Sequence, residues 1–210
     1  MKRVHPTTPL WVKLTAAVVL LGAAGWWIAD WRDVRGNERR LSAIASEIAG
    51  REVRVRCPGM VGRLFGWDIV EGSVRFDAGG TPQDETKIRT QSCGELDALA
   101  EGRRGKELAC IGRTGIACGR HGRATTMAVD VLAHEAWHLR GVIDEGETEC
   151  RSLQTMAWTA QQLGATAEQG HAMALAQFDG MYHELPSRYR SGNCVDGGPL
   201  DLRPGDPRFP

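Results

Sequence analysis

The chain has no excess of charge of either sign. Lysine and arginine together number 26 in 210 residues, and aspartate and glutamate also number 26. A protein that binds nucleic acid through its phosphates carries a basic surplus, so this balance indicates no nucleic-acid partner. The sequence also lacks an internal repeat and a long low-complexity segment. Its length suits one domain with a small appendage.

No Cys-x-x-Cys pair occurs, and no Cys/His spacing is typical of a structural zinc knot. The six cysteines all lie after residue 56, and their even number predicts three disulfides in an oxidising compartment. The alternative is six buried thiols in a cytosolic protein. The sequence does not choose among the fifteen possible pairings. A bond between Cys150 and Cys194 would hold the C-terminal tail against the helices that precede it.

The N-terminal segment is apolar. Residues 14–29 are uncharged, and adding the apolar residues before Lys13 gives a stretch of about 20 residues, enough to cross a bilayer as a helix. We therefore expect a transmembrane signal anchor over 9–30, with residues 1–8 in the cytoplasm. A cleaved signal peptide is the alternative, although tryptophans stand where small residues would precede cleavage. Either interpretation exports the rest of the chain, and the first makes it a single-pass protein of the cell membrane.

Beyond this segment the sequence predicts an α+β fold, in which a small N-terminal β-sheet region is followed by helices. Residues 31–50 are typical of a helical stalk or a first helix, and residues 51 to about 118 contain short alternating runs bounded by glycine. After residue 124 the pattern becomes helical. The tail, 190–210, has too much glycine and proline for regular structure. We expect one domain over 51–210.

The segment "TTMAVDVLAHEAWHLRG" has the start and stop signals of a helix that ends at Gly141. His134 and His138 are four residues apart, so both imidazoles project from one face, one turn from each other. Two neutral imidazoles at this spacing can share a Zn²⁺ ion. Glu135 lies on the adjoining edge of the helix, where its carboxylate can take a proton from a water molecule that the metal activates.

The motif His134-Glu135-x-x-His138 resembles the defining motif of the zincin metallopeptidases. The resemblance covers about twenty residues. It implies that the motif helix lies beneath a small sheet, that the two histidines bind zinc and that Glu135 is the general base. It also implies a peptide or protein substrate.

Three residues compete for the role of third zinc ligand. A tight antiparallel return after Gly141 would bring Glu149 to the level of the histidines, which makes it the favoured ligand. Asp144 completes a pattern that resembles the aspartate-bearing metzincins, but with Glu147 it also forms a capping box for the next helix. Glu145 is the remaining candidate and would lie near the loop.

Tyr182 and His183 follow the last predicted helix, and zincins often have a tyrosine or histidine donor for the oxyanion. Surface positions are the alternative for both. The sequence thus predicts a membrane-anchored extracytoplasmic zinc peptidase. The other interpretation is a disulfide-braced binding or scaffolding module with a structural or inactive zinc site. Glu135 favours the peptidase, because a purely structural site has no use for a base there.

Overall fold

The structure is a computed structural model that describes residues 10–58, 71–206 and 209–210. The chain forms two compact units, Met1–Gly36 and Asn37–Pro210. Helix α1 (Leu10–Ala49) begins in the first unit and ends in the second. The site lies in the second unit, on which the following paragraphs concentrate.

The predicted transmembrane helix is corrected by the structure. Within the part of the chain that the structure describes, no helix is both long and apolar enough to cross a membrane. The sequence gives the physical reason. Lys13 and Asp30 confine the uncharged run to residues 14–29.

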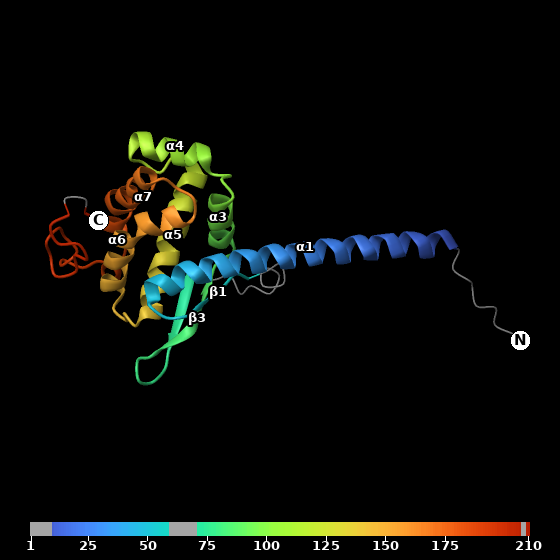
Figure 1. Cartoon of the computed structure of the whole chain (residues 1–210), viewed down its shortest axis with the longest axis horizontal. Helices are drawn as coiled ribbons and strands as arrows, with labels where there is room; N and C mark the ends of the chain where they lie inside the picture. Colours follow the sequence, from blue (N-terminus) through green and yellow to red (C-terminus); the bar gives the residue numbers. More distant parts are fainter. Residues whose placement is uncertain (1–9, 59–70, 207–208) are drawn as a thin grey trace, which may run out of the picture. The chain divides into compact units, whose positions relative to one another are not determined.

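The second unit contains five helices after α1 and a sheet of three short strands, in the ranges described (Figure 1). The strands are β1 (Arg54–Arg56), β2 (Gly72–Phe76) and β3 (Pro82–Ile88). The helices are α3 (Thr90–Ala100), α4 (Gly105–Thr114), α5 (Gly119–Arg140), α6 (Glu145–Gln162) and α7 (Ala167–Gly180). Two 3-10 turns follow, η1 (Tyr182–Glu184) and η2 (Ser187–Tyr189).

The α+β prediction, with strand signals as far as residue 118, is wrong because the structure is mostly helical. Beyond Ile88 the segment 90–114 forms helices α3 and α4. The missed signal is a helical spacing of apolar residues. Cys93, Leu96 and Leu99 recur every three residues and are all buried, which is the pattern of a helix with one face in the core.

The sheet packs against the motif helix α5. The strand order is β1-β3-β2, with β1 parallel and β2 antiparallel to β3, so β2 is an edge strand of the sheet as described. Thr86 of β3 donates a hydrogen bond to Glu135 of α5, and the ring of Phe76 in β2 lies 5.9 Å from that of His138. The sheet thus covers the face of α5 that carries the motif.

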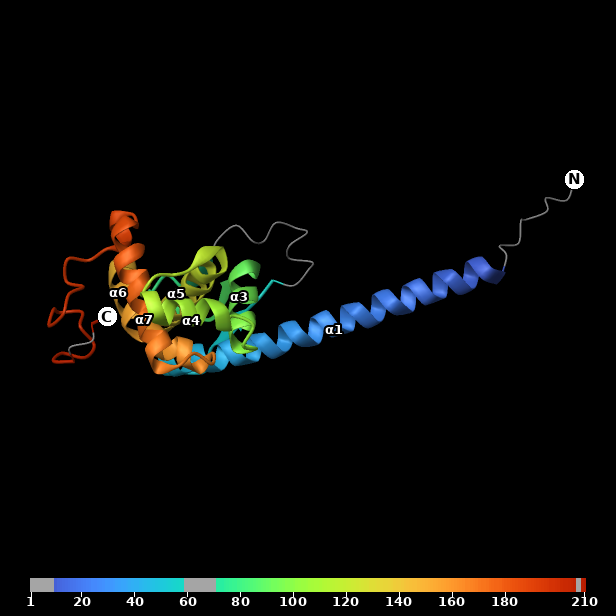
Figure 2. The ribbon, with the colours of Figure 1, turned by 90° about the horizontal axis from the view of Figure 1, so that it is seen from above.

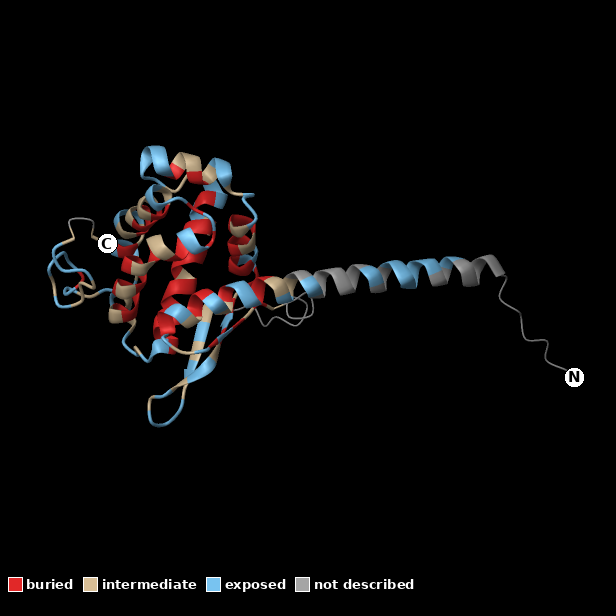
Figure 3. Ribbon diagram, in the orientation of Figure 1, coloured by how far each residue is buried: buried red, intermediate tan, exposed pale blue. Residues whose placement is uncertain are grey.

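Helix α5 is the centre of the hydrophobic core (Figure 3). It contacts α3, α6 and α7 as well as β2 and β3. Apolar side chains along its length, among them Val129, Leu132 and Leu139, are fully buried. Burying such residues stabilises a helix by roughly 1.5–3 kcal/mol per large side chain. The motif is therefore carried by the most firmly packed element of the unit.

All six cysteines form disulfides, as the sequence predicted. The pairs are Cys57–Cys93, Cys110–Cys118 and Cys150–Cys194. The last bond ties the irregular C-terminal segment to α6, beside which this segment runs in Figure 2. Tyr182 and Leu153 pack around it. The tail thus remains ordered without regular secondary structure.

Candidate metal centre

Helix α5 carries the motif residues, and the prediction of a helix here is confirmed. It begins at Gly119, before the segment quoted from the sequence, whose first residue is Thr125. Thr125 lies inside the helix, and its hydroxyl donates to the carbonyl of His121. It ends where Gly141 takes the left-handed conformation, with φ +107°, and its N–H returns to the carbonyl of His138. Such a glycine is the usual stop signal of a helix.

Helix α6 returns antiparallel to α5 after this glycine. Asp144 is its N-cap and accepts a hydrogen bond of 2.8 Å from the backbone N–H of Glu147, which confirms this half of the predicted capping box. The side chain of Glu147 pairs with Arg151. Three contacts between the helices define their register. They pair Asp130 with Ser152, His134 with Glu149, and His138 with Glu145. The indole N–H of Trp137 also donates to Thr155, which fixes the two helices further.

The Nε2 atoms of both histidines converge on one carboxylate oxygen. Oε2 of Glu145 lies 3.1 Å from Nε2 of His134 and 3.2 Å from Nε2 of His138. The three ligand atoms all lie within 4.8 Å of one another. Glu145 is the first residue of α6, and its carboxylate remains 38% exposed while both histidines are buried. The structure therefore brings together His134, His138 and Glu145.

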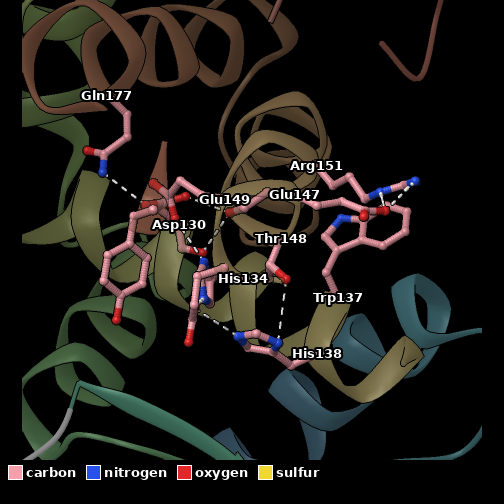
Figure 4. A network of polar contacts seen from close by, with 12 residues as sticks. Asp130, His134, Trp137, His138, Glu147, Thr148, Glu149, Arg151 and Gln177 are labelled. Atoms are coloured by element: carbon pink, nitrogen blue, oxygen red, sulfur yellow. Dashed lines mark hydrogen bonds and ion pairs between the residues drawn. The ribbon is translucent and has the colours of Figure 1, made fainter. Parts of the chain in front are cut away.

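The other ring nitrogen of each histidine has a partner of its own, which Figure 4 shows for His134 and Glu149. Nδ1 of His134 lies 2.8 Å from a carboxylate oxygen of Glu149, and Nδ1 of His138 lies 2.7 Å from the carbonyl oxygen of Val142. An Nδ1–H that donates to a carboxylate or a carbonyl fixes the tautomer and turns Nε2 toward a metal. Glu149, the favoured ligand from sequence, thus lies on the Nδ1 side of His134, away from the point where the Nε2 atoms meet.

Behind Glu149 lies a buried polar network centred on Asp130 (Figure 4). Asp130 accepts hydrogen bonds from the hydroxyl of Ser152, at 2.5 Å, and from the amide of Gln177, at 2.9 Å. Burial and the neighbouring Glu149 carboxylate raise the pKa of Asp130 well above its ordinary value. These contacts connect α5, α6 and α7 beneath the histidines, so they hold Glu149 in place.

The charges of the site follow from its burial and its carboxylates. Burial lowers the pKa of His134, but hydrogen bonds to Glu145 and Glu149 outweigh it and raise that pKa to about 10. Burial and the nearby charge of His134 lower the pKa of His138. The hydrogen bond from His134 lowers the pKa of Glu145. The metal-free site therefore holds a proton on His134, which a metal ion would have to displace.

Glu135 lies beside this group, under the edge strand. Its side chain is buried, with Oε2 accepting from the hydroxyl of Thr86 at 3.1 Å. A Cβ atom on Gly72 would overlap the side chain of Glu135, so any larger residue where β2 passes Glu135 would displace that side chain. Burial raises the pKa of Glu135 to about 7, a value suited to a group that exchanges protons at neutral pH.

A pocket of about 400 Å³ opens onto His134, Glu135 and Glu149. Its other walls come from β2, α5, α7 and the turns after α7, and most of them are apolar. Tyr189 lines it, with its ring 6.0 Å from that of His134. The sequence analysis missed Tyr189, because it stands in an irregular segment 51 residues after His138 and only the fold brings it back.

Tyr182 and His183, the predicted oxyanion donors, do not line this pocket. The hydroxyl of Tyr182 accepts from the backbone N–H of Ser191 at 2.8 Å and donates to its carbonyl, and its ring is buried near Cys194. His183 is exposed and packs edge-on against Phe178. The structure thus gives Tyr182 a role in holding the tail and gives His183 no contact with the motif.

The residues present could hold a zinc ion, and their three candidate ligand atoms all lie within 4.8 Å of one another. Two histidines and a glutamate are a common ligand set of catalytic zinc sites, which keep a fourth position open. Ligand atoms of a tetrahedral site with bonds of about 2.1 Å lie roughly 3.4 Å apart, close to the 3.1 Å and 3.2 Å between Glu145 and the two histidines. Histidines that bind zinc usually hydrogen-bond through their other ring nitrogen to a carboxylate or a carbonyl. Glu149 and the carbonyl of Val142 are such partners for His134 and His138.

No protein-family model, no curated protein and no solved structure matches the chain.

Proposed function

We propose that the chain is a zinc-dependent peptidase in which His134, His138 and Glu145 hold the ion. The observation that carries the proposal is the convergence of both Nε2 atoms on one oxygen of Glu145, with both Nδ1 atoms bound behind them. Zinc there would supply a Lewis acid and lower the pKa of a coordinated water molecule to about 7. The resemblance of the motif to zincins points to the same chemistry.

Glu135 is the proposed general base. It shares the pocket with His134, and its pKa of about 7 lets it take a proton from water and pass it to the leaving amine. The hydrogen bond from Thr86 orients its carboxylate, and Gly72 allows β2 to pass close above it. Tyr189 lines the pocket beside His134, which Tyr182 and His183 do not.

An extended peptide is the substrate that the surroundings favour. Strand β2 is an edge strand of the described sheet and reaches the pocket at Gly72. The free N–H and C=O groups of an edge strand can pair with an extended chain. The apolar lining from Met127, Val131 and Leu185 suits an apolar side chain of such a peptide. The three disulfides favour an oxidising, extracytoplasmic compartment.

The test combines metal analysis with a peptide-cleavage screen of the full chain. We expect one zinc per chain and cleavage of some library peptides. Glu135→Gln should keep the zinc and lose about 10²–10⁴-fold in rate, since proton transfer fails. Glu147→Gln is the matched control, because Glu147 pairs with Arg151 on α6 and does not line the pocket; it should change neither property.

Two results would overturn the proposal in different ways. A chain that binds no zinc would remove the metal centre altogether. A chain that binds one zinc but cleaves no peptide, or cleaves equally well with Glu135→Gln, would instead favour the disulfide-braced binding or scaffolding module with a structural zinc.

A further inference from the structure

The Cys110–Cys118 disulfide is more exposed than the other two. Both of its cysteines are half-buried, whereas the four remaining cysteines are at most 8% exposed. It joins α4 to the start of α5, and residues 112–116 and 119–121 on either side of Cys118 are exposed. Exposed and intermediate residues make up most of α4 (Figure 3). A thiol in solution therefore reaches this bond more easily than the two buried ones.

This disulfide also closes the shortest loop. Its cysteines are 8 residues apart in sequence, against 36 and 44 for the other pairs. A short loop restricts the unfolded chain least, so breaking this bond should destabilise the fold least. The hydroxyl of Thr114 holds the loop in addition, because it donates to the carbonyl of Cys110 and accepts from the N–H of Ile116. The protein can therefore open this bond and keep its fold.

Cys118 is the N-cap of the 22-residue helix α5, and within the described helix its side chain accepts no capping hydrogen bond. The first turn contains Arg120 and no acidic residue. A free Cys118 thiolate would be stabilised there by the unpaired N–H groups of the turn, and by the hydroxyl of Thr114, 3.6 Å from Sγ. The carbonyl of Ile116, 3.2 Å from Sγ, opposes this, but it belongs to the loop that the broken bond releases. Stabilising the reduced form makes a disulfide easier to reduce.

We propose that Cys110–Cys118 is a redox-active disulfide that exchanges with an external dithiol, while the two buried disulfides stay closed. A thiolate of the dithiol attacks Sγ of Cys110, the bond between Cys110 and Cys118 breaks, and Cys118 leaves as the thiolate. The second thiol of the dithiol, as its thiolate, then attacks the mixed disulfide and releases Cys110, which takes up a proton. Two electrons pass to the protein, and the dithiol becomes a disulfide.

The test is limited reduction of the folded full chain, followed by acid quenching, alkylation and mass spectrometry of each cysteine peptide. Dithiothreitol and reduced thioredoxin are used in parallel at the same thiol concentration. We expect Cys110 and Cys118 to be labelled about tenfold or more faster than the other four cysteines. Faster opening by thioredoxin would assign a protein dithiol as the partner, and faster opening by dithiothreitol a small one; both results support the exchange.

Single variants identify the leaving sulfur. Cys110→Ser leaves the thiol of Cys118, and Cys118→Ser leaves that of Cys110. The Cys118 thiol should react with iodoacetamide at pH 7 about tenfold faster than the Cys110 thiol, because only Cys118 stands at a helix N-terminus. Equal rates would refute the assignment of Cys118 as the leaving group.

Double variants test whether the fold tolerates the open bond. Cys110→Ser with Cys118→Ser should stay folded by circular dichroism and lower the Tm less than Cys57→Ser with Cys93→Ser does. The second pair is the matched control for the loss of one disulfide. An equal or larger fall in Tm for the first pair would show that this bond is structural.

Labelling of all six cysteines at one rate would overturn the proposal, since reduction would then follow unfolding of the whole unit. Faster labelling of either buried pair would overturn it as well. None of these measurements uses a metal ion or a peptide substrate, so this proposal and the proposed peptidase activity stand or fall separately.

Discussion

The identity of the third ligand gives the sharpest test of the metal centre. Glu145→Gln should weaken zinc binding most, because Glu145 is the carboxylate on which both Nε2 atoms converge. Zinc binding free energies of about 10–16 kcal/mol, shared among four ligands, give roughly 2.5–4 kcal/mol per ligand. Losing that amount corresponds to about 10²–10³-fold in the dissociation constant.

Glu149→Gln should have a smaller effect, of about 10–100-fold, which is typical of a residue behind the ligands. The amide oxygen can still accept from Nδ1–H of His134, so the ring stays oriented while the negative charge is lost. Asp144→Asn should change the affinity by less than about threefold, because asparagine caps a helix about as well as aspartate and the side chain of Asp144 caps α6.

The assay is competition with a chromophoric chelator at pH 7, with circular dichroism to show that each variant is folded. Glu147→Gln, in the same helix turn but paired with Arg151, controls for loss of an α6 carboxylate. A larger loss with Glu149→Gln than with Glu145→Gln would refute the reasoning, because zinc would then lie on the Nδ1 side of His134. Loss of the metal with Asp144→Asn would make the loop aspartate the ligand.

Three further predictions concern His134, the Cys150–Cys194 disulfide and Gly72. Folding raises the pKa of His134 from 6.5 to about 10, so the proton on His134 stabilises the folded state below this range. Without metal, the unfolding free energy should therefore fall by up to about 5 kcal/mol as the pH rises from 6.5 to about 10. Urea titrations at several pH values should show this fall without zinc and none with zinc bound. Replacing both Cys150 and Cys194 by alanine should lower the unfolding free energy by about 4 kcal/mol, from the chain entropy of a 44-residue loop, and a loss below about 1 kcal/mol would show that the tail adds little. Gly72→Ala should keep zinc but slow peptide cleavage, because the new Cβ would displace Glu135; unchanged cleavage would show that β2 does not restrain the base.

The local features of the site could be predicted because their causes are local. The four-residue spacing of His134 and His138 fixes their common face in any helix. Gly141 and Asp144 are stop and start signals that act within a few residues, and both work as expected in the structure. The choice of Glu149 assumed a tight antiparallel return of α6, and the structure has this return.

The choice between Glu145 and Glu149 could not be made from axial level alone. Glu149 does lie level with His134, as expected, but it meets Nδ1 and not Nε2. Which ring nitrogen faces which carboxylate depends on the rotation of each imidazole, and for His138 the carbonyl of Val142 decides it. Contacts of this kind arise from tertiary packing and leave no periodic trace in the sequence.

The errors over residues 51–118 have a different origin. The alternating pattern of β3 is real, but it stops at Ile88, and Thr90 already begins α3. A short apolar run fits a strand and a buried helix equally well, so periodicity could not separate them. The burial of Leu96 and Leu99 against α5 decides in favour of the helix.

The polar network behind the histidines explains how a site with so many carboxylates can remain buried. Glu149 and Asp130 are both almost fully buried, and two adjacent negative charges there would repel each other strongly. The raised pKa of Asp130 favours its neutral form, which weakens this repulsion. Ser152 and Gln177 then fix Asp130 by their hydrogen bonds.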